Sequence, residues 1–178
     1  MPENNRAGNV IIYTGDGKGK TSAAIGTAVR ASGHGNKILI VFFLKGTGYK
    51  HGEVIALGKL PEISIKSFGQ DGWVKKGNVA EGDIEQAQLA LECSRKAIIG
   101  SDFDFVIMDE VLAALDCGLI EFGELESVIK NRPSEVSLVL TGRNADKRLY
   151  DVADIITEMK PVKYTYGTKN IARKGLDY

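Results

Sequence analysis

Short apolar runs, rich in β-branched residues, alternate along the chain with longer segments in which apolar residues recur at helical spacing. Most of the short runs are continuously apolar, as expected for strands of a parallel sheet that helices cover on both faces. The predicted strands are 9–14, 37–43, 63–68, 105–109, 136–141 and 154–159, and the predicted helices are 20–32, 52–59, 80–99, 121–130 and 145–152. This alternation predicts an α/β fold with a mostly parallel six-stranded sheet and helices on both of its faces.

The segment 80–99 carries the clearest helical pattern. Its mostly apolar stripe, spaced by three and four residues, comprises Ile84, Ala87, Leu91, Ser94 and Ile98. Such a stripe predicts the face of the helix that packs on the core. Gly100 follows, and is expected to end the helix.

Length and charge limit the classes of function. A chain of 178 residues suits one domain, here 1–178, with a core of ordinary size. Lys plus Arg and Asp plus Glu both total 23, so the net charge is zero. That balance argues against a general nucleic-acid binder, but it allows a local cationic site for one anionic ligand.

The two cysteines, Cys93 and Cys117, lack the C-x-x-C spacing of zinc and redox sites and fit a reducing compartment. The N-terminus is polar, unlike a signal peptide. No apolar run approaches the roughly 20 residues of a membrane helix. We therefore expect a cytoplasmic protein that uses neither membrane nor nucleic acid as a partner.

The stretch "TGDGKGKT" (14–21) nearly matches the phosphate-loop pattern G-x-x-x-x-G-K-[ST], but Thr14 stands where the first glycine belongs. The stretch follows a predicted strand and opens a predicted helix, which is the context that the pattern requires. The alternative is a glycine-rich strand–helix turn with no ligand. Three glycines and two lysines in one turn favour the phosphate loop.

Each residue type in this loop has a function in holding a triphosphate. The glycines Gly15, Gly17 and Gly19 let successive amides converge on phosphate oxygens, and the helix start adds its positive dipole end. Lys20 and Lys18 supply cationic charge, and Thr21 offers a hydroxyl to Mg²⁺. The predicted ATP contacts are Thr14, Gly15, Asp16, Gly17, Lys18, Gly19, Lys20, Thr21 and Ser22.

A second motif, "DFVIMDEV" (104–111), is an apolar strand that ends in Asp109 and Glu110. This is the form of a Walker B segment, whose Asp lies near Mg²⁺ across from the phosphate loop. Both motifs lie at the carboxyl ends of predicted parallel strands, where α/β sheets bind ligands. Thr21 and Asp109 are therefore the predicted metal ligands, in a single-domain P-loop fold of the RecA-like type. From position alone, Glu110 is a candidate for the water-activating base of an ATPase.

Arg143, in "LTGRNA" (140–145), follows another strand end and can pair with phosphate bidentately. The alternative is an exposed arginine in a helix-capping turn. The last segment, 160–178, contains five cations and a single acid, Asp177. Its composition fits either a solvated cationic tail or a segment that contacts an anionic ligand.

These residues resemble those of the ATP:cob(I)alamin adenosyltransferases of corrinoid biosynthesis and salvage. The resemblance extends nearly end to end and is most specific in its first and last motifs. The matching stretches are "YTGDGKGKTSAAIGTA" (13–28), "FLKG" (43–46), "DFVIMDE" (104–110), "LTGR" (140–143), "DVADIITEMKPVKY" (151–164) and "ARKGLDY" (172–178).

The resemblance implies transfer of the 5′-deoxyadenosyl group of ATP to the cobalt of cob(I)alamin or a related corrinoid, with tripolyphosphate as the leaving group. On this reading Lys20, Lys18, the loop amides and the metal neutralise the leaving group, and Arg143, which can pair with phosphate, joins the two lysines as a predicted catalytic residue.

The resemblance implies that Thr21, Asp109 and Glu110 hold the metal, Mg²⁺ or Mn²⁺, directly or through water. It gives Glu110 no role as a base, because this reaction needs none. Thr14 matches the family's own loop. The family binds ATP back to front, with the terminal phosphate deep in the loop and the ribose facing cobalt.

On the corrinoid side the resemblance implies aromatic side chains that displace the lower ligand of cobalt, for which Phe68 and Trp73 in "SFGQDGW" (67–73) are the candidates. Phe68 is equally explained as a core residue at a strand end. The resemblance also implies a homodimer and an electron-donating flavoprotein reductase as partners.

Two other functions remain open from the residues alone. A small-metabolite or nucleoside kinase would use the loop in its usual orientation and release ADP. A RecA-like ATP-dependent binding module would make no small-molecule product. The neutral charge and the ending "KGLDY" favour the adenosyltransferase.

Overall fold

The computed structural model describes residues 7–46, 51–72, 74–163 and 173–176. A six-stranded sheet forms its centre, with the spatial order β3-β2-β4-β5-β1-β6, and every neighbouring pair of strands is parallel. The strands are β1 (Val10–Thr14), β2 (Ile38–Phe42), β3 (Ile63–Ser67), β4 (Phe105–Asp109), β5 (Ser137–Thr141) and β6 (Ile155–Glu158).

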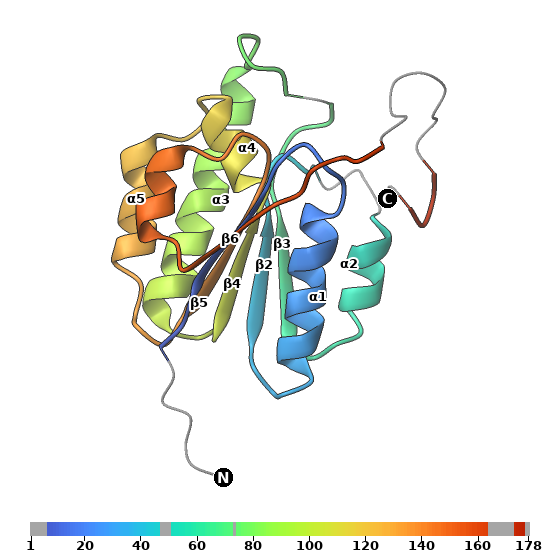
Figure 1. Ribbon diagram of the computed structural model, residues 1–178, viewed down its shortest axis with the longest axis vertical. Helices are drawn as coiled ribbons and strands as arrows, with labels where there is room; N and C mark the ends of the chain where they lie inside the picture. Colours follow the sequence, from blue (N-terminus) through green and yellow to red (C-terminus); the bar gives the residue numbers. More distant parts are fainter. Residues whose placement is uncertain (1–6, 47–50, 73, 164–172, 177–178) are drawn as a thin grey trace.

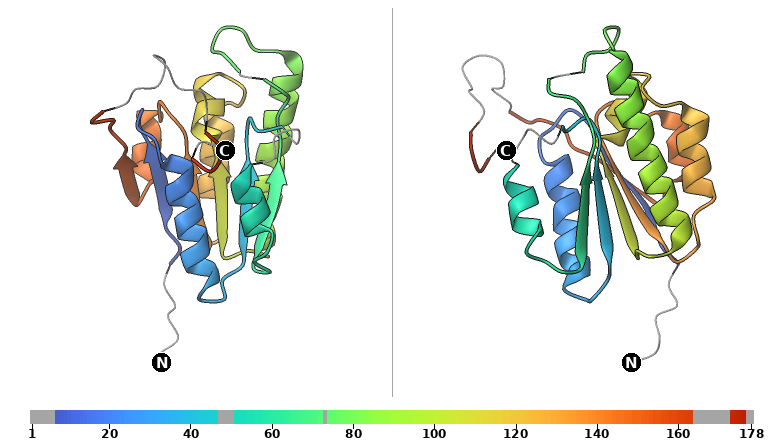
Figure 2. Two further views of the ribbon diagram at one scale, coloured as in Figure 1. Left: turned by 90° about the vertical axis from the view of Figure 1, so that its right-hand side faces the viewer. Right: turned by 180° about the vertical axis from the view of Figure 1, so that it is seen from behind.

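Helices cover both faces of this sheet. The helices are α1 (Lys20–Ser32), α2 (Gly52–Leu57), α3 (Glu81–Gly100), α4 (Val111–Asp116), α5 (Phe122–Lys130) and the 3₁₀ helix η1 (Lys147–Val152). Figures 1 and 2 show α1 and α2 on one side of the sheet and α3, α5 and η1 on the other. Helix α4 lies at the carboxyl end of β4, on the side of α3 (Figure 1). The predicted α/β class is confirmed, and the arrangement is consistent with a P-loop-like fold.

The continuous apolar character of the strands follows from this double cover. Along β2, Ile38, Ile40 and Phe42 pack in the core beneath α1 and α2. The intervening Leu39 and Val41 pack in the opposite core, beneath α3 and α5. Each residue of β2 therefore meets a helix layer whichever way it points, and neither face of this strand needs polar positions. The edge strand β6 differs, because all of its residues are exposed.

Some predicted elements differ from the structure. Helix α4 was not predicted, because its six residues are too few to show a helical period. The predicted helix 145–152 is a 3₁₀ helix that begins at Lys147, with Asp146 as its N-cap. In α3, Ile84 is 42% exposed and is not part of the buried stripe. Helix α3 includes Gly100, and Ser101, in the left-handed conformation with φ 53°, caps it.

The sheet order determines which loops meet. Strand β5 lies between β1 and β4, in parallel with both. The carboxyl ends of all three strands therefore share one edge of the sheet, where ligands bind in folds of this type. The loop 15–19, the pair Asp109-Glu110 and the segment 142–146 all begin at this edge. Within the described part of the chain, no helix combines the length and the apolar character needed to span a membrane.

Candidate active site

Thr14, which replaces the first glycine of the phosphate-loop pattern, is the last residue of β1. Its side chain is buried, and its hydroxyl oxygen accepts a hydrogen bond from the amide of Ala145 at 3.3 Å. The backbone carbonyl of Thr14 accepts from the amide of Met159 at 2.8 Å. A glycine could not make the side-chain bond. Thr14 therefore ties the start of the loop to the segment that follows β5.

The loop glycines are explained by the close approach of Met159, which follows β6. A Cβ on Gly15, whose φ is +95°, would lie 2.5 Å from the carbonyl oxygen of Met159, and one on Gly17 would lie 2.7 Å from it. The amide of Gly17 donates to that same oxygen at 2.7 Å. The Gly17 N–H therefore points at Met159 in this structure, and the predicted convergence of all three glycine amides on phosphate stays a prediction.

The Lys20 side chain is folded back onto the loop. It is 7% exposed, and its ammonium donates to the carbonyl oxygens of Gly15 at 2.7 Å and Gly17 at 2.8 Å. The residue opens α1, directly after Gly19, whose φ of 114° only glycine adopts easily. A cation is therefore held at the centre of the loop by backbone carbonyls.

Charged residues from the phosphate loop, from the end of β4 and from the segment after β5 all act on Lys20. Burial lowers the pKa of the Lys20 ammonium. The charges of Glu110, Asp16 and Asp109 oppose this shift, and that of Arg143 adds to it. The structure thus brings the phosphate loop, the Walker B acids and Arg143 close enough to interact, as the sequence predicts.

Asp109 ends β4 in a buried position, with 1% of its surface exposed. Both carboxylate oxygens have partners: the hydroxyl of Thr141 donates to Oδ1 at 2.7 Å, and the ammonium of Lys45 donates to Oδ2 at 2.8 Å. The Thr141 oxygen also accepts from the amide of Glu110 at 2.9 Å. This network holds the acid in one orientation at the ligand-binding edge.

Glu110 has an unusual backbone conformation. Its φ is 63°, which is costly for a residue with a side chain and recurs at functional sites. Burial, and secondly the charge of Asp109, raises the pKa of its carboxyl group, while Lys45 and Lys20 lower it. A cation placed between the two acids would relieve their repulsion.

The donor atoms of the predicted metal ligands suit a hard divalent cation. Thr21 lies half-buried in the first turn of α1 and offers a hydroxyl, and Asp109 and Glu110 offer carboxylates. Mg²⁺ prefers oxygen ligands and is commonly bound by one or two protein carboxylates together with phosphates and water. The ammonium of Lys45 already shows that the Asp109 carboxylate accepts a cation. These residues therefore fit Mg²⁺ or Mn²⁺.

The other predicted residues lie around this centre. Asp16, Lys18, Ser22 and Arg143 are exposed at the same edge. Phe68 directly follows β3 and is partly buried against the core beneath α3, so its alternative role as a core residue has structural support. Trp73 lies outside the described residues.

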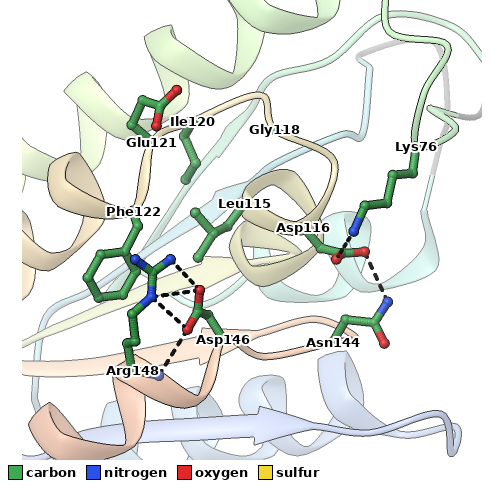
Figure 3. A pocket seen from close by; sticks show the side chains of 10 residues that line it. All are labelled: Lys76, Leu115, Asp116, Gly118, Ile120, Glu121, Phe122, Asn144, Asp146 and Arg148. Atoms are coloured by element: carbon green, nitrogen blue, oxygen red, sulfur yellow. Dashed lines mark hydrogen bonds and ion pairs between the residues drawn. The ribbon is translucent and has the colours of Figure 1, made fainter.

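A hollow of about 390 Å³ adjoins the site (Figure 3). Its wall includes Asn144, next to Arg143, and Lys76, from the loop that contains Trp73. Asp116, at the end of α4, accepts from Lys76 at 2.7 Å and from Asn144 at 3.0 Å. The hollow thus lies between the segment 115–122 and the segment after β5, and Lys76 reaches it from the chain that follows the stretch 67–73 predicted for the corrinoid.

Residues 6–178 match the family described as "ATP:corrinoid adenosyltransferase BtuR/CobO/CobP". The chain belongs to this family. A corrinoid adenosyltransferase of Escherichia coli is 31% identical over 174 residues, covering 96% of this chain and 86% of that protein. One of Pseudomonas aeruginosa is 33% identical over 172 residues, covering 96% and 84%. The corrinoid adenosyltransferase CobA of Salmonella typhimurium is 31% identical over 171 residues, covering 96% and 86%.

Membership of the ATP:corrinoid adenosyltransferases confirms the predicted enzyme class, a transferase whose small-molecule substrates are ATP and a corrinoid. It does not favour the kinase or the ATP-dependent binding module. The match includes the phosphate loop, the strand that ends in Asp109 and the segment after β5.

Sequence reasoning missed three contributors to the site. Lys45 and Thr141 bind Asp109, and Met159 packs on the loop glycines. All three lie within stretches that resemble the family, and Lys45 comes three residues after the end of β2. The position of Lys45 near a strand end was a signal that it shares the ligand-binding edge, but its partner was not deducible from spacing.

Proposed function

We propose that this chain transfers the 5′-deoxyadenosyl group of ATP to the cobalt of a reduced corrinoid such as cob(I)alamin, and releases tripolyphosphate. The observation that carries the proposal is the family match over residues 6–178. The geometry supports it, because the phosphate loop, Asp109 and Arg143 meet at one edge of the sheet. We propose that the whole chain, 1–178, acts as one domain in this reaction.

The reaction is a displacement at the ribose C5′. Co(I) supplies both electrons of the new Co–C bond and becomes Co(III), while the C5′–O bond breaks and its electron pair leaves with the triphosphate. No proton moves, so the step requires no general base. The protein must instead align the two substrates and neutralise the negative charge that gathers on the leaving group.

Lys20, Lys18 and Arg143 are the cations proposed for that neutralisation. Lys20 is satisfied by the carbonyls of Gly15 and Gly17 without a ligand. A triphosphate in the loop would offer anionic acceptors in place of these neutral carbonyls, and charge-assisted hydrogen bonds are the stronger ones. Asp16 and Ser22 complete the proposed ATP contacts from the rim of the loop.

Thr21, Asp109 and Glu110 are the residues proposed to hold Mg²⁺ or Mn²⁺, directly or through water. When bound, the ion would neutralise part of the triphosphate charge. Thr141 fixes one carboxylate oxygen of Asp109, and the φ of Glu110 turns that residue out of the line of β4. These residues thus orient oxygen ligands for the ion before any substrate arrives.

For the corrinoid we propose an approach over the edge between the loop 69–79 and the segment 142–146. The hollow in Figure 3 is walled mainly by the segment 115–122 and by residues 144–148, with Lys76 at its side, and offers amide, carboxylate and ammonium groups. The amide side chains at the periphery of a corrin can hydrogen-bond to such groups. Phe68 and Trp73 are the aromatic residues proposed to face the lower side of the ring.

The predicted partners are part of the same proposal. We propose a homodimer, in which the cationic segment 160–178 can reach the neighbouring active site, and a flavoprotein reductase that supplies the electron. Lys160 and Val162 are exposed, as such a reach requires. The free, half-buried thiols of Cys93 and Cys117 accord with the proposed cytoplasmic location.

One experiment tests the central proposal. The protein is incubated without oxygen with Mg·ATP and a chemically reduced corrinoid, and the products are separated. We expect a light-sensitive cobalt–carbon product and tripolyphosphate in equal amounts. ADP or AMP as the only nucleotide product would contradict the proposal, and ADP would point to the kinase. Binding of a macromolecule that depends on ATP, without adenosylcorrinoid, would favour the binding module.

A further inference from the structure

The side chain of Lys45 forms an ion pair with Asp109, one of the proposed metal ligands. Its ammonium lies 2.8 Å from Oδ2 of Asp109 and 4.6 Å from the centre of the Phe42 ring, over its face. The Lys45 side chain is 19% exposed, and that of Asp109 is 1% exposed. A carboxylate buried to this extent without a cation would be strongly destabilising, so Lys45 stabilises the acid while no metal is bound.

The backbone of Lys45 is held firmly in place. Its amide donates to the carbonyl oxygen of Phe68 at 2.9 Å. Leu44, just before it, has a φ of 57°, and a Cβ on Gly69 would lie 2.7 Å from the Lys45 nitrogen. These contacts fix the root of the side chain, while its flexible stem leaves the ammonium free to change partners.

A second acceptor lies within reach of the same ammonium. Oε1 of Glu53, in the first turn of α2, is 3.9 Å from the Lys45 nitrogen, and the Glu53 side chain is 21% exposed. A small rotation of the lysine stem would shorten this contact and lengthen the one to Asp109. The Lys45 ammonium can therefore pair with Glu53 when another cation approaches Asp109.

We propose that Lys45 is the resident counter-cation of Asp109, which a divalent ion must displace, so that the metal binds weakly until a triphosphate arrives with it. A divalent ion and an ammonium on one carboxylate repel each other at short range. A triphosphate adds negative charge that attracts both. Lys45 thereby makes the binding of metal and nucleotide depend on each other, as coupled ligands do.

This inference rests on the proposed metal role of Asp109, but not on the corrinoid chemistry. Its test contains neither corrinoid nor nucleotide, so failure of adenosyl transfer and failure of this inference are distinguishable. Mn²⁺ alone is the probe, and its free concentration is measured by electron paramagnetic resonance in a titration of the nucleotide-free protein.

Lys45→Met should bind Mn²⁺ at least tenfold more tightly than the unaltered protein, because the competing ammonium is gone. Adding Asp109→Asn to this variant should abolish the gain. In chelator, Lys45→Met should melt several degrees below the unaltered protein, and saturating Mn²⁺ should close most of that gap. Unchanged or weaker Mn²⁺ binding by Lys45→Met would overturn the proposal.

Two controls separate a specific contact from a general change of charge. Lys76→Met removes a lysine whose nitrogen lies 2.7 Å from Asp116, away from Asp109, and should leave Mn²⁺ affinity unchanged. Arg143→Met removes a nearby cation that acts on Lys20 and Glu110. A gain as large as that of Lys45→Met in either control would refute a specific role for Lys45.

Lys45→Gln keeps the test valid if the methionine variant does not fold. Its amide can still donate to Asp109 but carries no charge. We expect Lys45→Gln to show a Mn²⁺ gain of at least fivefold with a smaller loss of melting temperature in chelator. An affinity equal to that of the unaltered protein would count against the proposal.

Discussion

The hydroxyl of Thr141 joins the ends of two neighbouring strands by donating to Oδ1 of Asp109 at 2.7 Å. The same oxygen accepts from the amide of Glu110 at 2.9 Å. Thr141 ends β5 and is fully buried, and β5 lies between the strand of the phosphate loop and the strand of the acids. One side chain therefore orients both proposed metal-binding acids.

Thr141→Val should destabilise the protein by about 2–4 kcal/mol, because it keeps the shape but leaves a buried carboxylate oxygen of Asp109 and the partly buried amide of Glu110 without their partner. Adenosyl transfer should fall at least tenfold, since Asp109 loses its orientation. Urea unfolding and initial rates measure the two effects. Thr157→Val, the same change on the exposed strand β6, should shift stability by less than about 0.5 kcal/mol. Equal effects of the two variants would show that the Thr141 bonds contribute little.

Gly17→Ala should impair ATP binding at least tenfold, because the added Cβ would meet the backbone of Met159 at 2.7–2.8 Å and push the loop away. Equilibrium dialysis with ATP measures this. Gly26→Ala is the matched control, since a Cβ on this residue of α1 meets nothing within 4 Å. The control should bind ATP normally and gain about 0.5–1 kcal/mol in stability. Normal ATP affinity in Gly17→Ala would mean that the loop tolerates displacement from Met159.

Lys20→Ala should reduce turnover by well over an order of magnitude, because the cation closest to the loop carbonyls would no longer neutralise the leaving triphosphate. The rate of adenosylcorrinoid formation at saturating Mg·ATP measures this loss. Lys59→Ala, an exposed lysine beyond α2, serves as the control for removal of one positive charge. Unchanged turnover in Lys20→Ala would refute the assigned role.

Asp146→Asn tests a pH-dependent contribution to stability. Hydrogen bonds from the side chain and backbone of Arg148 lower the pKa of Asp146 to about 2. A carboxyl group with a lowered folded-state pKa stabilises the protein above its ordinary value near 4 and loses this effect as the pH falls toward 2. Because Asn caps a helix as well as Asp does, the substitution removes only the charge that Arg148 pairs with. It should cost about 0.2–1 kcal/mol at pH 7, the usual range for an exposed ion pair.

The measurement for Asp146 is the difference in urea-unfolding free energy between the unaltered protein and Asp146→Asn, from pH 7 downward. The difference should stay constant to about pH 4.5 and then shrink as the pH falls further. A difference that grows below pH 4 would contradict the assigned direction of the pKa shift.

Local pattern was sufficient to predict the sheet. Continuous apolar runs such as 105–109 identify strands buried on both faces, and the strand bounds agree within one residue of the structure. The 3.6-residue period of 80–99 likewise identified α3, which spans Glu81–Gly100. Helix α4 lacked such a signal, because six residues after Glu110 complete fewer than two turns.

Only those residues of the candidate site that belong to a motif of fixed spacing could be predicted from the sequence. The loop glycines, Lys20 and Asp109 could be proposed from the sequence because their chemistry requires fixed spacing. Lys45 and Met159 act through contacts between segments far apart in the chain, and spacing carries no information on such contacts. The function predicted for Gly17 shows the same limit: its amide faces Met159, a partner that only the folded chain reveals.

The contact between Gly17 and Met159 also affects how the chain acquires its activity during synthesis. The phosphate loop leaves the ribosome well before Met159, the residue that accepts from its Gly17 amide, which comes 142 residues (159 minus 17) later in the chain. The loop cannot take its final shape until β6 has been made and has docked on β1. Affinity for ATP should therefore appear late and abruptly, and a nascent or truncated chain that ends before residue 159 should not sequester nucleotide.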